Sequence, residues 1–186
     1  DAKGPVALVD YHGRAVYGSD SIPDEKEIED RLAAYYQPYH RQLQQALQMS
    51  HIKGLLDCHS LKGIGPPEAP DAGEKRKDII LGNNGGPDGE NNPARGETIC
   101  TLALLNFMKQ VFEEKGFSVS LNVPYAGGFI AAHYGRSLVA DGKMALQIEI
   151  NQNLYVDPLT EEMIPSKVAD VRAGIFECLQ KIGNAI

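Results

Sequence analysis

The stretch "MALQIEI", residues 144–150, has the strict alternation of a β-strand, in which successive side chains point to opposite faces. Its four large apolar residues share one face of the strand: Met144, Leu146, Ile148 and Ile150. Gln147 and Glu149 fall on the other face. The stretch is therefore predicted to be a strand of a sheet, with a carboxylate on the face opposite its apolar side chains.

Strands and helices surround this stretch in an order that favours an α/β protein. Apolar alternation and short apolar runs predict three further strands, at 52–58, 78–82 and 117–123. Apolar spacing of three and four residues predicts three helices, at about 21–49, 98–116 and 166–181, the first two capped by Ser21 and Thr98. The order helix, strand, strand, helix, strand, strand, helix favours a three-layer sandwich around a mostly parallel or mixed sheet. The tyrosines of the first helix are predicted to lie in the core.

The composition is that of an ordinary globular domain. With 186 residues, 42% hydrophobic and 23% charged, the chain is expected to form one domain over residues 1–186. A net charge of −7 argues against a phosphate-tracking surface, so nucleic acid is not an expected partner. The run "EKRKD", residues 74–78, is the most basic and is flanked by acids, so it is interpreted as a solvated loop. The sequence shows neither a membrane-spanning apolar run nor a signal peptide, which predicts a cytoplasmic protein with no membrane partner.

The cysteines and the loops give two further predictions. Cys58, Cys100 and Cys178 make no CxxC spacing and are odd in number, so all three are predicted to be free thiols, with Cys58 in the core. Two long loops rich in Gly and Pro, residues 62–77 and 83–96, separate the predicted elements. Long loops in a compact domain usually carry function or mobility.

The stretch "LLDCHS", residues 55–60, adds a histidine to the carboxylate of Glu149. Sites on α/β sheets gather at the carboxyl ends of strands, where both residues are predicted to fall. A catalytic zinc takes three protein ligands and a water, and a nearby carboxylate can accept the proton of that water. His59 could be a ligand, Glu149 the base, and Asp57, on the same strand face, could orient the imidazole. The alternative is that His59 is only a hydrogen-bonded residue at a strand end, because no histidine here has HxxE or HExxH spacing.

Four motifs in the same order resemble the N-formylglutamate amidohydrolase family, zinc hydrolases related in fold to zinc carboxypeptidases and the phosphorylase/hydrolase-like proteins. They are "LLDCHS", "DIILG" (78–82), "NVPYAGGFIAAHYGR" (122–136) and "ALQIEIN" (145–151), and residues 13–43 resemble the family's long helix. The resemblance implies that His59 is a zinc ligand and Glu149 the catalytic carboxylate.

The same resemblance places "PYAGGFIAAHYG", residues 124–135, at the substrate pocket. Four residues there match the family pattern: Tyr125, Gly127, Gly128 and His133. Paired glycines would let the backbone approach a ligand closely. The alternative from the residues alone is a tight turn between strands.

Three departures from the family pattern bear on metal and substrate. A family segment with an "HSG" motif, bearing further zinc ligands, has no counterpart here, so the chain is expected to be a fragment, with a divergent member that cannot hold zinc in the usual way as the alternative. Asn84 and Ala132 stand where family members have arginines, which could hold a substrate carboxylate in a bidentate fork. Arg136 or Arg95 could supply a replacement cation.

The function expected from the resemblance is zinc-dependent hydrolysis of a small N-acyl amino acid, N-formyl-L-glutamate to formate and L-glutamate. Another metal-dependent amidase or carboxypeptidase-like hydrolase with a different substrate is the first alternative, because the two arginines are missing. A non-catalytic binding domain on the same fold is the second.

Overall fold

The computed structural model describes residues 4–10 and 13–186, and the chain divides into two compact units. The first comprises Asp1–Ile52 and Gly65–Gly73, and the second comprises Lys53–Ile64 and Glu74–Ile186. The expectation of one domain over residues 1–186 stays a prediction.

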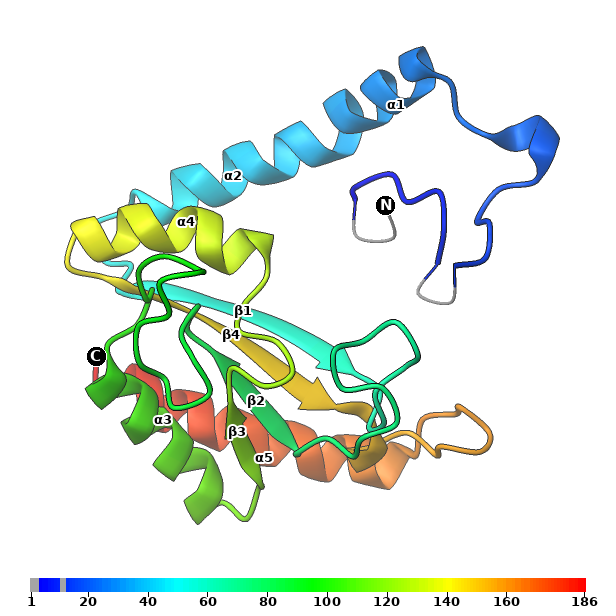
Figure 1. Ribbon diagram of the computed structural model, residues 1–186. Helices are drawn as coiled ribbons and strands as arrows, with labels where there is room; N and C mark the ends of the chain where they lie inside the picture. The colour runs from blue at the N-terminus through cyan, green and yellow to red at the C-terminus, as the bar shows by residue number, and fades with distance from the viewer. Residues whose placement is uncertain (1–3, 11–12) are drawn as a thin grey trace. The chain divides into compact units, whose positions relative to one another are not determined.

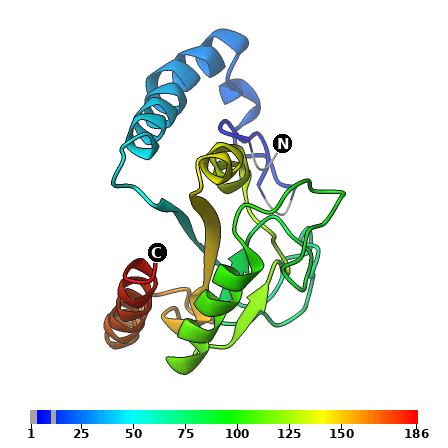
Figure 2. The same cartoon turned by 90° about the vertical axis from the view of Figure 1, so that its left-hand side faces the viewer.

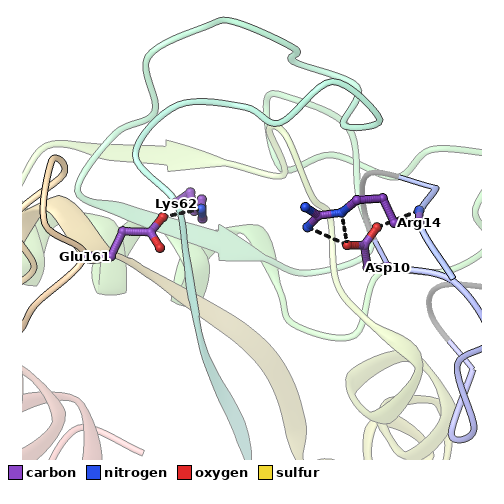
Figure 3. A network of polar contacts seen from close by, with 4 residues as sticks. All are labelled: Asp10, Arg14, Lys62 and Glu161. Atoms are coloured by element: carbon purple, nitrogen blue, oxygen red, sulfur yellow. Dashed lines mark hydrogen bonds and ion pairs between the residues drawn. The ribbon is translucent and has the colours of Figure 1, made fainter. Parts of the chain in front are cut away.

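The first unit consists mainly of consecutive helical segments, drawn in blue to cyan in Figure 1. They are a 3-10 turn η1 (Ser19–Ser21), α1 (Glu25–Arg31), a π-helical turn η2 (Leu32–Tyr36) and α2 (Gln37–Leu47). The cap of α1 is Asp24 and not Ser21, since the Asp24 carboxylate accepts a 2.7 Å bond from the Glu27 amide. Ahead of these helices, the Arg14 guanidinium lies 2.7 Å from the Asp10 carboxylate (Figure 3).

The tyrosines of this helical region are not core residues, so that prediction is wrong. Tyr35 and Tyr39 are 77% and 51% exposed, and none of the described residues of α1, η2 and α2 is buried. The half-buried stripe runs through Ile28, Leu32 and Tyr36 instead. Helical spacing identified the covered face, but the two neighbouring tyrosines lie outside that stripe.

The second unit contains one mixed four-stranded sheet. Its strands are β1 (Gly54–Leu61), β2 (Ile79–Gly82), β3 (Val119–Leu121) and β4 (Met144–Asn151), in the order β1-β4-β2-β3. β1 runs parallel to β4, β2 runs antiparallel to β4, and β3 runs parallel to β2. The strands in 144–150 and 78–82 lie where the sequence predicted them, and the mixed sheet is confirmed.

Helices cover both faces of this sheet (Figures 1 and 2). The helices α3 (Leu102–Glu114) and α5 (Pro165–Gly183) pack on the face that carries Leu146 and Ile148, and together they form the main hydrophobic core. On the other face, α4 (Phe129–Ala140) packs against β4 and β1. The three-layer α/β sandwich is therefore confirmed.

The helix α4 was not predicted from the sequence. Its residues were interpreted as a pocket segment on the family resemblance, with a tight turn as the alternative from the residues alone. The glycine at 135 also disfavours a helix locally. In the structure, Ala131 and Gly135 are both buried. A Cβ on Gly135 would lie 3.1 Å from Ala145 Cβ, so the glycine permits a close approach of helix and strand.

Several boundaries and one burial prediction are corrected by the structure. The strand predicted to continue to Val123 ends at Leu121, because Asn122 adopts a left-handed conformation with φ 57° and turns the chain away. The cap of α3 is Thr101 and not Thr98. All three cysteines are free, as predicted, but Cys58 is exposed, because it lies on β1 at the edge of the sheet.

Across the described part of the chain, every helix is too short or too polar to cross a membrane.

Candidate active site

Two neighbouring strands bring four polar side chains together on one face of the sheet. In the parallel pairing of β1 with β4, Asp57 is opposite Gln147 and His59 is opposite Glu149. Partners in parallel strands point to the same face, and this face lies opposite the Leu146 side that packs in the core. His59 and Glu149 are therefore side by side. Both lie inside their strands, which continue to residues 61 and 151, and not beyond the strand ends as predicted.

Asp57 holds the imidazole of His59. Asp57 Oδ1 lies 2.9 Å from His59 Nε2, which agrees with the expectation that both side chains share a face. Because a carboxylate only accepts hydrogen bonds, Nε2 carries a proton here, and in the neutral ring Nδ1 is then the nitrogen with a lone pair. The His59 side chain is 45% exposed and that of Asp57 is 12% exposed, so the imidazole is open to solvent while its partner is largely covered.

Glu149 is a buried carboxyl whose environment favours the protonated form. Only 7% of the residue is exposed, and burial raises the pKa of its carboxyl. The charge of His59, a hydrogen bond from Gln147 and the charge of Arg76 partly offset this pKa rise. The hydrogen bond is short, with 2.5 Å between Gln147 Nε2 and Glu149 Oε1. A carboxyl with a raised pKa beside an imidazole is suited to accepting and returning a proton.

The segment before α4 passes close over the sheet and ends above Gln147. A Cβ on Gly82 would lie 2.7 Å from the carbonyl carbon of Ala126, so the two backbones touch at that point. Gly127 has φ +136°, a conformation that favours glycine, and Gly128 is the N-cap of α4. A Cβ on Gly128 would lie 3.0 Å from Gln147 Oε1. The backbone at Gly128 thus comes close to the Gln147 side chain. A contact of the paired glycines with a substrate stays a prediction.

His133 and Arg136 do not join this cluster. Both are exposed, and they lie on the side of α4 opposite Ala131 and Gly135, which pack toward the sheet. The His133 ring stacks on Phe129, with 4.9 Å between ring centroids and 13° between planes. The roles of His133 and Arg136 in binding substrate stay predictions. Neither side chain belongs to the cluster around Glu149.

The two positions expected to hold arginine differ in their surroundings. Asn84 is buried in a left-handed conformation, with φ 67°. Its Nδ2 donates to the carbonyl oxygens of Arg95 and Glu97, at 3.0 and 3.1 Å, so its side chain anchors the loop that follows β2. Ala132 is half-buried on α4.

Arg76 is a cation of this site that the sequence did not reveal. It belongs to the run "EKRKD", which was interpreted as a solvated loop, yet Arg76 is half-buried. Its Nη1 donates to the Lys62 carbonyl oxygen at 3.1 Å, and its guanidinium carbon lies 5.4 Å from the centre of the Tyr125 ring. The Lys62 side chain forms an exposed ion pair with Glu161, with 2.9 Å between Nζ and Oε1 (Figure 3). The charge of Arg76 acts on Glu149, so the solvated-loop interpretation is wrong for this residue.

The fit of zinc to these residues is partial. Over residues 4–10 and 13–186, no three His, Cys, Asp or Glu side chains are grouped so that they could hold a metal. His59, with Nε2 held by Asp57, offers one imidazole of the three protein ligands that a catalytic zinc takes.

Fold and site together define a class: a three-layer α/β protein in which a buried glutamate and an imidazole meet on adjacent parallel strands. The family model described as N-formylglutamate amidohydrolase matches residues 1–156, and the chain belongs to this family.

Two known proteins show how far the likeness extends. The chain is 28% identical over 181 residues to the N-formylglutamate deformylase of Pseudomonas aeruginosa, covering 92% of this chain and 61% of that protein. It also resembles the crystal structure of N-formylglutamate amidohydrolase from Ralstonia eutropha JMP134, with a TM-score of 0.62, 26% identity, and coverage of 86% of this chain and 54% of that one. The chain thus spans between half and two thirds of the length of these relatives.

Proposed function

We propose that the protein hydrolyses the N-acyl bond of a small N-acyl amino acid, N-formyl-L-glutamate, and releases formate and L-glutamate. The observation that carries this proposal is the buried Glu149 beside His59 in a chain of this family. One relative is named a deformylase of N-formylglutamate, which supports the choice of substrate.

Glu149 is the proton-transferring group in this proposal. Its carboxylate accepts a proton from the attacking water, and the protonated carboxyl then gives it to the nitrogen of the leaving amino acid. Burial raises the pKa of Glu149, which makes the protonated form easier to reach during the reaction. Gln147 fixes Oε1 of this carboxyl through its 2.5 Å hydrogen bond, so Glu149 does not have to reorganise between the two transfers.

Zinc is the metal proposed for this site, with His59 as one ligand. Nδ1 is the ligating nitrogen, because Asp57 engages Nε2. When bound, zinc lowers the pKa of a coordinated water and polarises the acyl carbonyl. The described residues supply this one ligand, and the remaining ligands are not assigned.

The substitution Glu149→Gln in the full-length protein tests the proposal. It keeps the shape of the side chain and removes its proton acceptor, so kcat should fall by about 10²–10⁴-fold. Metal content, measured by elemental mass spectrometry, should be unchanged in this variant and reduced in His59→Ala. The matched control is Glu113→Gln on the exposed surface of α3, which should have wild-type turnover. Turnover above a tenth of wild type in Glu149→Gln excludes Glu149 as the acceptor.

A second candidate is an amidase of the same family with another acyl or side-chain preference. It is favoured by Asn84, whose amide is committed to the loop after β2 and does not provide the fork of an arginine. A screen of N-formyl, N-acetyl and N-succinyl amino acids with the full-length protein distinguishes the two candidates. No turnover of any of them, together with no bound zinc, would indicate the non-catalytic alternative.

A further inference from the structure

A substrate of the proposed kind presents an electrostatic problem at this face of the sheet. N-formylglutamate carries two carboxylates, and the face already holds the carboxyls of Asp57 and Glu149 next to the single imidazole of His59. Like charges brought close in a partly buried site repel one another strongly. Besides a metal at His59, a fixed protein cation near Glu149 would therefore favour binding of such a substrate, and Asn84 and Ala132 provide none.

Arg76 is in the right place because of how β2 pairs with β4. The two strands are antiparallel, with Ile79 opposite Ile150, so the residues just before β2 lie near the end of β4. Asn151, the last residue of β4, fixes this approach: its Nδ2 donates to the carbonyl oxygens of Arg76 and Lys77, at 3.1 and 3.2 Å. Asn151 is itself buried, at 5% exposure, so the anchor is firmly embedded.

The guanidinium of Arg76 is also held in a defined orientation. Its carbon lies 5.4 Å from the Tyr125 ring centre, Nη2 is 3.4 Å from the Tyr125 hydroxyl, and Nη1 donates to the Lys62 carbonyl oxygen at 3.1 Å. A planar guanidinium over an aromatic ring loses little entropy when it binds a planar carboxylate, whereas a lysine would lack both features. Tyr125 belongs to the segment that continues into α4 above Gln147, so cation and ring border the same site.

We propose that Arg76, positioned by Tyr125 and the Lys62 carbonyl, binds a carboxylate of the N-acyl amino acid and makes the site selective for an acidic substrate. This inference rests on the proposed function. It assigns to Arg76 the task that arginines at positions 84 and 132 were expected to perform, and it uses neither Arg95 nor Arg136.

The test compares three substrates in the full-length protein and in Arg76→Met and Arg76→Lys. N-formylglutamate has both carboxylates, N-formylglutamine lacks the charge of the side-chain carboxylate, and N-formyl-4-aminobutyrate lacks the α-carboxylate. Lys75→Met changes the neighbouring exposed lysine and is the matched control.

The result expected for Arg76→Met is a selective loss. Its kcat/KM should fall by about 10- to 150-fold, mainly through KM, for the substrates that carry the bound carboxylate, since this is the range for a charge-assisted hydrogen bond. For the one substrate that lacks that carboxylate, kcat/KM should fall by less than about threefold. The substrate that is least affected therefore identifies which carboxylate Arg76 binds. Arg76→Lys keeps the charge and should show a smaller loss with the same selectivity, which gives a result even if Arg76→Met does not fold.

Equal losses for all three substrates in Arg76→Lys, or no loss in either variant, would overturn the assignment while leaving the proposed function intact. Failure of the wild-type protein to hydrolyse any of the three substrates would overturn the proposed function and this inference with it.

Discussion

The substitution Gly135→Ala should push α4 away from the sheet and weaken both stability and activity. A Cβ at this position would lie 2.6 Å from Ile99 Cγ2 and 2.7 Å from Ile99 Cβ, closer than carbon atoms can approach. Ile99 cannot move aside easily, because its amide donates to the Asn83 carbonyl oxygen and its own carbonyl oxygen accepts from the Ala145 amide.

The magnitude follows from two opposing effects. Overpacking a close contact costs about 1–3 kcal/mol, and the fixed Ile99 places this case in the upper part of that range, about 2–3 kcal/mol. Alanine is a better helix former than glycine by about 1 kcal/mol. The free energy of unfolding should therefore fall by about 1–2 kcal/mol, and Tm should fall by about 2–8 °C.

The assay is urea unfolding of Gly135→Ala alongside Gly183→Ala. Gly183 is the last residue of α5, and among the described residues nothing lies within 4 Å of the position of its Cβ, so that variant reports the helix-propensity effect without a clash. The propensity effect is common to both variants, so the difference between them should equal the clash, about 2–3 kcal/mol. A difference below about 0.5 kcal/mol would refute the close packing of α4 on the sheet. The kcat of Gly135→Ala should also fall, because displacement of α4 moves Gly128 relative to Gln147.

Three further predictions concern buried polar groups and thiols. The Asn83 side-chain amide donates to the carbonyl oxygens of Gly89 and Cys100, so Asn83→Ala should lower the free energy of unfolding by about 1–3 kcal/mol for each of these two acceptors. An unchanged midpoint of urea unfolding would contradict this. Ellman's reagent should modify Cys58 first, because Cys58 is exposed and Cys100 and Cys178 are buried. Burial raises the pKa of all three thiols, that of Cys100 to about 12, so access decides the order and equal rates would contradict the burial pattern. Because the pKa of Glu149 is raised in the folded protein, its ionisation opposes folding as the pH rises, so Glu149→Gln should be more stable than wild type at pH 8 and lose this advantage near pH 3. If Glu149→Gln were more stable than wild type by the same amount at pH 8 and pH 3, burial of the ionised Glu149 carboxyl would not be the cause.

The sequence predicted most of the sheet and the helices on its apolar face, because their patterns are local. The alternation in 144–150 fixed both faces of β4, and Gly116, with φ +95°, ends the helical region of α3 as predicted. The helix α4 was missed for a physical reason. Gly135 disfavours a helix locally, and its place there is explained by close packing against Ile99 and Ala145, which the local pattern does not show.

The candidate site could be predicted only in part. His59 and Glu149 were recognised as residues, but their proximity depends on the register of β1 with β4, which alternation alone does not specify. Arg76 was missed for a similar reason. Its nearness to Glu149 follows from the antiparallel pairing of β2 with β4, and a run of mixed charges usually indicates a solvated loop.

The polar face under α4 is costly for the fold, and this cost is itself an argument for function. Gln147 and Glu149 are buried, and among the described residues Asp57 Oδ2 and Gln147 Oε1 are enclosed without a hydrogen-bond partner. Each such acceptor costs about 1–3 kcal/mol relative to a satisfied one. Apolar side chains at 57 and 147 would remove that cost. Stability alone therefore does not explain why Asp57 and Gln147 are polar. Their hydrogen bonds to His59 and Glu149 do explain it, because these bonds hold the imidazole and the carboxyl in one orientation.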